Sequence, residues 1–190
     1  MRKQMGIGIL VTALLVLTSA ALAQVNSNIG IVTLNATLTE SLTVSVNSGS
    51  TVNFNLAPNT AINAGSTTTG ITTAWVLKPG RTSVAVWSYF NSATSALLHQ
   101  TGGGTVDIPS SAVKIQAGGG ANPYNALTNV SPFNAAASGL QIGASIGITG
   151  VNKSSSRTDT LAYQIDTTVV PQLPADSYIG TLNIQAQATP

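Results

Sequence analysis

The side chains that could perform acid-base or nucleophilic chemistry are few in this sequence. It contains one histidine, no cysteine and five acidic residues. A Ser-His-Asp arrangement would have to use His99, which lies in a Leu-Leu-His-Gln segment just before a run of glycines. The acidic residues do not occur in closely spaced pairs of the kind that hydrolyse glycosidic bonds. We therefore expect no catalytic residues and no enzymatic activity.

Metal and cofactor sites have equally little support. Transition metals prefer clusters of His and Cys, and calcium prefers clustered oxygen ligands that usually include Asp or Glu. The sequence has no such cluster. Two runs of three glycines, at 102–104 and 118–120, are not followed by the Lys-Ser/Thr pair of a phosphate-binding loop. The expectation is no metal site and no cofactor.

Four aromatic residues are the remaining candidates for ligand contact, because Trp and Tyr rings can stack on sugar rings. These candidates are Trp75, Trp87, Tyr89 and Tyr124. Trp75 and Trp87 fall in two strands that we expect to form one hairpin. Packing in or near the core is therefore the favoured interpretation of both indoles.

Residues 1–23 have the pattern of a cleaved export signal. Arg2 and Lys3 precede an apolar run over residues 5–20, and a small-x-small sequence follows at 21–23. An uncleaved membrane anchor is the less favoured alternative, because the cleavage site follows the apolar run directly. We expect export to the periplasm, the cell surface or the extracellular space, with no membrane span after cleavage.

The expected mature chain, residues 24–190, carries no net charge. Without Arg2 and Lys3, five basic residues remain against five acidic ones. This balance excludes nucleic acids and anionic membrane surfaces as partners. Charged residues make up 6% of the chain, against roughly 25% in an average soluble domain. Such a surface offers little charge repulsion against self-association. The length of the mature chain predicts a single domain.

Alternating apolar and polar residues predict an all-β chain with almost no helical periodicity. Residues 71–77 and 82–90 flank Lys78-Pro79-Gly80-Arg81, which predicts a hairpin with a type II turn. Residues 41–56 are expected to form part of a meander, and 91–100 a short helical turn. The expected strands cover residues 29–38, 41–46, 52–56, 71–77, 82–90, 106–108, 113–115, 140–149, 158–168 and 178–188. With about nine to eleven strands, an antiparallel two-sheet β-sandwich of immunoglobulin-like or jelly-roll type is favoured, and a closed barrel is the alternative.

The segment LPADSYIGTLNI at residues 173–184 resembles the closing strand of exported bacterial β-sandwich domains. The families are the spore coat protein U-like domains and the chaperone-usher pilus subunits. Two features depart from their pattern: Asp176 stands where these families usually carry Gly, and the cysteine pair of many members is missing. A weaker similarity links residues 75–77 to WxL-type cell-wall domains.

The pilus-like resemblance implies a structural subunit that polymerises by giving an extended strand to the sheet edge of its neighbour. Residues 24–38 are the expected donor, and the side chains expected to insert are Val32, Leu34, Ala36 and Leu38. Alternatively, this segment is the first strand of its own sandwich.

Three functions remain open at this point. The favoured one is a non-catalytic secreted or cell-surface structural protein, such as a pilus, fibre or coat subunit that self-associates or pairs its sheet edge with another surface protein. The second is a secreted adhesion module that binds a glycan or a protein through exposed aromatic residues. The third is an enzyme built on His99.

Overall fold

The structure is a computed structural model that describes residues 27–101, 106–118, 122–127 and 139–190. The expected export signal lies outside the described residues. The chain divides into two units, Met1–Thr37 and Leu38–Pro190. In the first unit, residues 27–37 form no strand. The predicted strand at 29–38 is therefore wrong for the single chain: the segment has the alternating pattern of a strand, but it belongs to no sheet.

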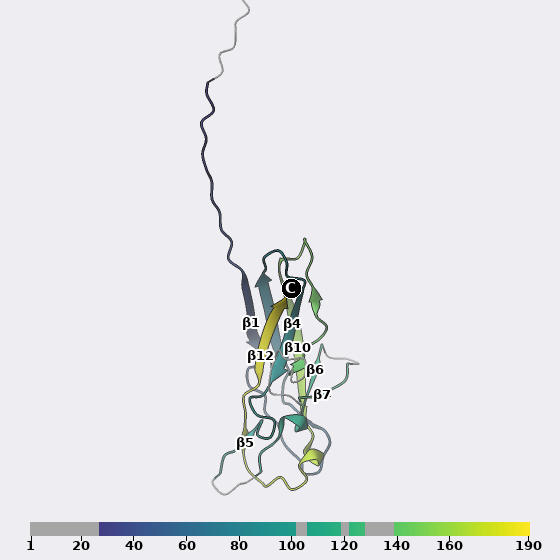
Figure 1. The fold of residues 1–190 in the computed structure, drawn as a ribbon. Helices are drawn as coiled ribbons and strands as arrows, with labels where there is room; N and C mark the ends of the chain where they lie inside the picture. Colours follow the sequence, from purple (N-terminus) through teal and green to yellow (C-terminus); the bar gives the residue numbers. More distant parts are fainter. Residues whose placement is uncertain (1–26, 102–105, 119–121, 128–138) are drawn as a thin grey trace, which may run out of the picture. The chain divides into compact units, whose positions relative to one another are not determined.

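The unit Leu38–Pro190 is all-β and built from antiparallel sheets, as predicted (Figure 1). The larger sheet has the order β1-β3-β10-β6-β7, with β2 also paired to β10. Its strands are β1 (Ser41–Ser48), β2 (Asn63–Ala64), β3 (Thr69–Val76), β6 (Val113–Ala117), β7 (Asn125–Ala126) and β10 (Ser154–Ile165).

The second sheet has the order β12-β4-β8, with β9 also paired to β4. Its strands are β4 (Ser83–Tyr89), β8 (Leu140–Gln141), β9 (Ile146–Gly147) and β12 (Asn183–Thr189). A short third sheet pairs β5 (Leu98–His99) with β11 (Tyr178–Ile179). Two single-turn 3-10 helices complete the described elements, η1 (Ser110–Ala112) and η2 (Thr167–Val169). None of the helices among the described residues is long and apolar enough to cross a membrane.

The core lies between the two larger sheets. Burial alternates strictly along β3 and β4, because successive side chains of a strand point to opposite faces. Ile71 of β3, Val86 of β4 and Leu161 of β10 belong to one cluster of buried apolar side chains. The sandwich is thus held by residues that the period-two pattern of the sequence places on one face.

The predicted hairpin between residues 71–77 and 82–90 is wrong. The turn is present, with Gly80 at a φ of +96°, but β3 and β4 belong to different sheets. Leu77 donates its backbone N–H to Lys153, and Thr82 donates its own to Thr189. Because each end of the turn bonds to a different sheet, the connection crosses between the sheets and pairs no strands.

Two predicted strands are interrupted. The segment 140–149 forms β8 and β9 on either side of Gly143, which has a φ of +66°. The segment 178–188 forms β11 and β12, separated at Gly180. A Cβ on Gly180 would lie 2.0 Å from the carbonyl oxygen of Ala96, so only glycine allows this close approach. The first break leaves both short strands paired with β4. The second moves the chain from pairing with β5 to pairing with β4.

Two further predictions are wrong in detail. Residues 52–56 contribute only an isolated bridge between Phe54 and Gly65, so the expected meander does not form. The expected helical turn at 91–100 is replaced by β5. In both places a short apolar pattern was too weak to decide between local and long-range partners.

Candidate functional site

One side of the sandwich is open. β1 and β12 lie next to each other, one in each larger sheet, and each is the last strand of its sheet order. Their inward side chains are only partly covered: Leu42 and Val44 of β1 and Ile184 of β12 are half-buried, and Val46 is 50% exposed. The inward positions of the neighbouring strands β3 and β4 are buried instead. The apolar interior is therefore accessible from the side between β1 and β12.

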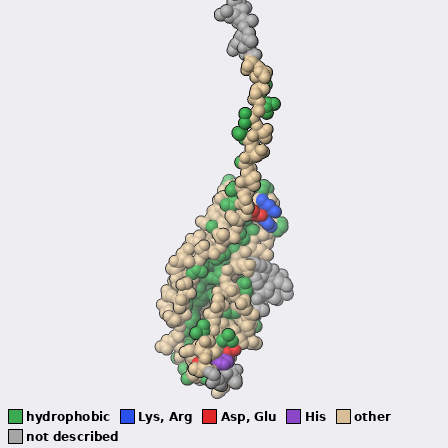
Figure 2. Space-filling view, turned by 90° about the vertical axis from the view of Figure 1, so that its left-hand side faces the viewer, with side chains coloured by type: hydrophobic (Ala, Val, Ile, Leu, Met, Phe, Trp, Pro, Cys, Tyr) green, Lys and Arg blue, Asp and Glu red, His purple; other side chains and the backbone are tan. Residues whose placement is uncertain are grey.

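We refer to the inward faces of β1 and β12 as the open groove. Figure 2 looks onto the side of the molecule that carries β1 and β12, and it shows a stripe of hydrophobic side chains running along it. One end of the groove is a cavity of about 280 Å³. Its lining comes from the start of β1, the end of β12 and the turn between β3 and β4: Glu40, Ser41, Leu42, Leu77, Arg81, Ala186, Gln187 and Ala188.

The backbone of β12 also offers hydrogen bonds on this side. Within the described residues β12 pairs with β4 only. In an antiparallel ladder, alternate residues direct both backbone groups to the same side. Thr189 accepts a hydrogen bond from Thr82 at the start of β4. The peptide groups of Ile184, Ala186 and Ala188, which are out of phase with Thr189, therefore face the open groove.

An ion pair between Arg81 and Glu40 lies at one end of the groove. Arg81 Nε lies 2.9 Å from Glu40 Oε1, and Arg81 also donates to the carbonyl oxygen of Ala188 at 3.4 Å. Lys78 Nζ lies 3.8 Å from the same carboxylate. The hydrogen bond from Arg81 lowers the pKa of Glu40 below its usual value. The bridge links the start of β1 to the end of β12, so these two strand ends lie together.

The expected donor residues are almost fully exposed. Leu34 is 89% exposed, and Val32, Ala36 and Leu38 are exposed as well. The apolar residues Ile29 and Ile31, on the opposite phase, are exposed to a similar extent. The first residues of the expected donor, 24–26, lie outside the described part of the chain. Runs of exposed large apolar side chains are typical of segments that bind another surface.

The four aromatic candidates do not form one site. Trp75 is 4% exposed and donates its indole N–H to the carbonyl oxygen of Asn152 at 2.8 Å, so it belongs to the core. Trp87 and Tyr89 lie on the outer face of β4 and are half-buried. Tyr124 is 36% exposed and lies between β6 and β7 in the sequence. Only Trp87 and Tyr89 lie on the same surface.

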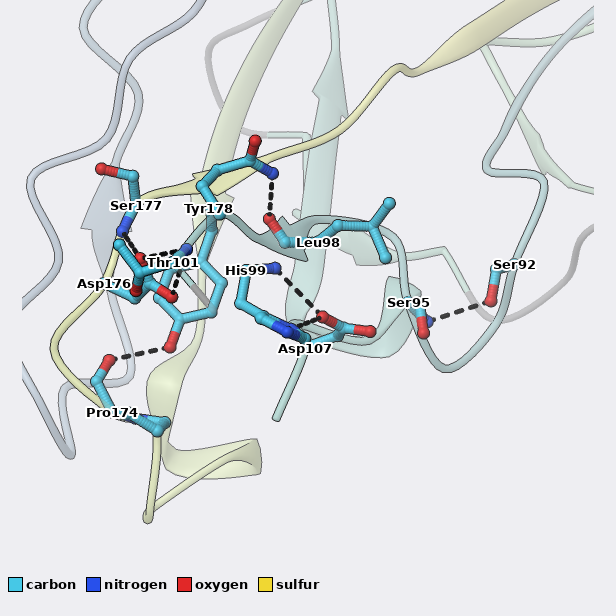
Figure 3. A network of polar contacts seen from close by, with 11 residues as sticks. Ser92, Ser95, Leu98, His99, Thr101, Asp107, Pro174, Asp176, Ser177 and Tyr178 are labelled. Atoms are coloured by element: carbon cyan, nitrogen blue, oxygen red, sulfur yellow. Dashed lines mark hydrogen bonds and ion pairs between the residues drawn. The ribbon is translucent and has the colours of Figure 1, made fainter. Parts of the chain in front are cut away.

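His99 belongs to a polar network around β5 and β11 (Figure 3). Its Nδ1 lies 2.7 Å from Asp107 Oδ1, and its backbone N–H donates to the same oxygen. The backbone N–H of His99 is the main cause that lowers the pKa of Asp107.

The Asp176 carboxylate accepts the backbone N–H groups of Thr101 and Ser177. The hydroxyl of Tyr178 donates to the carbonyl oxygen of Pro174. These contacts hold β5, β11 and their connecting loops together, which is a structural role.

Chemistry at His99 has limited support in this network. The described contacts of its side chain include a carboxylate, but no serine hydroxyl. Among the described residues there is no group of three or more His, Cys, Asp or Glu side chains that could hold a metal ion. The open groove is therefore the most developed candidate site, and the side chains along it are mainly apolar. The sequence pattern predicted strands at the positions of β1 and β12, but it did not predict that they lie side by side at the sheet edges and form a groove.

Comparison with known proteins adds little to this description. No protein-family model matches the chain, and no curated protein matches it. Among solved structures, the chain is similar to a subunit in the structure of a chaperone-usher pilus, with 11% sequence identity and a TM-score of 0.40. The match covers 87% of this chain and 99% of the pilus chain. This sequence identity and TM-score are too low to assign a family or a function to the chain.

Proposed function

We propose that this protein is a non-catalytic structural subunit of an exported surface fibre or coat, and that it assembles by β-strand addition. In this assembly, residues 24–38 of one copy occupy the open groove of the next. The observation that carries the proposal is the groove: a half-exposed apolar interior beside the hydrogen-bonding edge of β12. The export pattern of residues 1–23 supports a role outside the cytoplasm.

The donor and the groove match in number and spacing. Four inward side chains follow one another at every second position from residue 182 to residue 188: Leu182, Ile184, Ala186 and Ala188. Four apolar residues follow one another in the same way from residue 32 to residue 38. Because side chains on one face of a strand repeat every two residues, one inserted strand can place all four opposite the four positions of β12.

Side-chain size favours an antiparallel arrangement. With the donor antiparallel to β12, Leu34 lies opposite Ala186 and Ala36 lies opposite Ile184, so a large side chain meets a small one in both central pairs. Leu38 then lies opposite Leu182, which is the one pair of two large side chains. With the donor parallel, Leu34 meets Ile184 and Ala36 meets Ala186. Crowding at one pair and a void at the next both reduce stability in a close-packed interior.

The antiparallel arrangement also favours a second copy as the donor. The groove cavity joins the start of β1 to the end of β12. If the segment before Ser41 turned back into the groove of its own chain, it would run parallel to β12. It would also have to reverse direction within Thr39 and Glu40. Donation between copies needs neither a tight reversal nor the parallel orientation.

A truncation tests the proposal. The chain 24–190 is expected to form oligomers or filaments in light scattering and negative-stain electron microscopy, and the chain 39–190 is expected to stay folded and monomeric. The truncated chain keeps the groove but lacks the donor, so adding it to the longer chain should shorten the filaments. Assembly by the truncated chain would contradict the proposal. Unfolding on truncation would also contradict it, because the segment would then pair within its own chain.

A further inference from the structure

The outer face of the second sheet carries an uncharged aromatic strip. β4 directs Ala85, Trp87 and Tyr89 outward, and the inward positions between them are buried. Gln185 of β12 pairs directly with Trp87, and Gln187 pairs with Ala85. The strands β4, β8, β9 and β12 contain no charged residue. This face therefore combines two adjacent aromatic rings with amide side chains and no net charge.

The two tryptophans differ in their surroundings. The indole N–H of Trp75 has an acceptor in the carbonyl oxygen of Asn152. The indole N–H of Trp87 is buried and has no acceptor among the described residues. Because a buried donor without a partner costs free energy, a Trp kept at such a position calls for an explanation. Trp75 packs in the core, whereas the Trp87 ring is only partly buried and leaves part of its surface on the outer face beside Ala85.

Amide side chains lie next to the rings. The hydroxyl of Tyr89 lies 3.3 Å from Oε1 of Gln185, which holds that amide between the two aromatic residues. Rings at positions two apart on a strand are about 6.8 Å apart along it. Such a spacing accommodates one or two pyranose rings. The C–H face of a pyranose packs on an aromatic ring, while its hydroxyl groups bond to the neighbouring amides.

We propose that the strip formed by Ala85, Trp87, Tyr89, Gln185 and Gln187 binds a neutral glycan. Trp87 supplies the stacking platform, and Gln185 and Gln187 supply hydrogen bonds to the sugar hydroxyls. The uncharged surface selects against anionic polysaccharides, which have no cation to pair with on these strands. The absence of charge on the strip therefore matches a neutral sugar chain.

Glycan binding at the strip is separable from strand addition. On β12, Gln185 faces the strip, whereas Ile184 and Ala186 face the groove. A ligand on the outer face therefore leaves the groove free. Gln187 lies on the strip side but also borders the cavity at the end of the groove. Substitutions of Ala85 and Trp87, which do not line the groove cavity, are expected to change glycan binding and leave assembly unchanged, so the two proposals can fail independently.

The test measures binding of cellohexaose, chitohexaose and laminarihexaose to the chain 24–190 by isothermal titration calorimetry, with tryptophan fluorescence as a second readout. The sequence has only two tryptophans, so a spectral change on binding can be assigned with Trp87→Phe. We expect Trp87→Ala to weaken binding by about 30-fold, as for a Trp at the centre of a binding surface. Tyr124→Ala removes an exposed aromatic residue elsewhere and is expected to change the affinity by less than about twofold.

A blocking variant covers the case in which Trp87→Ala does not fold. Ala85→Arg keeps both rings but places a long charged side chain beside Trp87, and it is expected to abolish binding. Failure of all three hexasaccharides to bind would overturn the proposal. Equal loss of affinity in Trp87→Ala and Tyr124→Ala would overturn it too, as would a change in filament formation by Ala85→Arg without any change in glycan affinity.

Discussion

Leu34→Ala tests the assignment of donor and groove most directly, because the same side chain has opposite environments before and after assembly. In the single chain Leu34 is 89% exposed. Truncating it should therefore leave the melting temperature of the unassembled subunit unchanged. In the proposed assembly Leu34 lies opposite Ala186, where there is room for a large side chain.

The magnitude follows from burial. Burying a Leu side chain stabilises by about 1.5–3 kcal/mol. A loss of about 2 kcal/mol corresponds to roughly a 30-fold lower association constant. The assay is fluorescence anisotropy of a labelled peptide of residues 24–38 titrated with the chain 39–190, and the unfolding of the full chain is followed by circular dichroism at low concentration.

Thr33→Ala is the matched control. Thr33 is adjacent in sequence, but it points to the outer face of an inserted strand, so its truncation should change the association constant by less than about threefold. Equal effects of Leu34→Ala and Thr33→Ala would refute the register. A lower melting temperature of the unassembled Leu34→Ala chain would refute donation between copies, because Leu34 would then be packed within its own subunit.

Three further predictions concern the stability of the subunit, measured by urea unfolding. Asp166 is 7% exposed, and a hydrogen bond from Lys114 is the main cause that lowers its pKa. The carboxylate therefore stabilises the fold above the ordinary Asp pKa, and this contribution is lost as the pH falls through the lowered pKa. Asp166→Asn should reduce the loss of stability between pH 7 and pH 3. Gly180→Ala should cost about 1–3 kcal/mol, because its Cβ would collide with the carbonyl oxygen of Ala96. Trp75→Phe should cost about 1–3 kcal/mol, because it leaves the carbonyl of Asn152 without its donor.

The local patterns of the sequence predicted the strands better than their partners. The alternation around residues 71–77, 82–90 and 158–168 reappears in β3, β4 and β10. The turn at Lys78-Pro79-Gly80 was also predicted, because its conformation depends only on these neighbouring residues. Whether such a turn joins paired strands or crosses between sheets depends on distant acceptors, here Lys153 and Thr189. No pattern within the turn contains that information.

The same distinction explains which part of the candidate site was predictable. Period-two patterning identifies Ile184 and Ala186 as inward-facing, but it does not say whether another strand covers them. Coverage depends on which strands lie at the sheet edges, and that is a property of the whole topology. The aromatic candidates show the reverse problem, because Trp75 and Trp87 both lie in apolar strand segments. Trp75 lies on the buried face of β3 and Trp87 on the outer face of β4, and the sequence pattern did not separate these two cases.

The sequences of the two edge strands support the proposal that another strand fills the groove. Natural sheet proteins usually protect an exposed edge with lysine, proline, a strong bulge or a covering loop. β12 has the sequence NIQAQAT and β1 has SLTVSVNS, with neither charge nor proline in either. The charged residues at the groove, Glu40, Lys78 and Arg81, gather at one end and leave its length uncharged.

β1 has a register shift between Val46 and Ser48, but neither edge strand has a charged residue or a proline. Such edges beside a half-exposed apolar interior make a chain with few charged residues prone to indiscriminate aggregation. A strand that fills the groove removes both hazards at once, because it buries the apolar side chains and satisfies the peptide groups of β12. The alternating segment ending at Leu38 has the length and the pattern for this task. These features support the proposal that the open edge is half of an interface between copies.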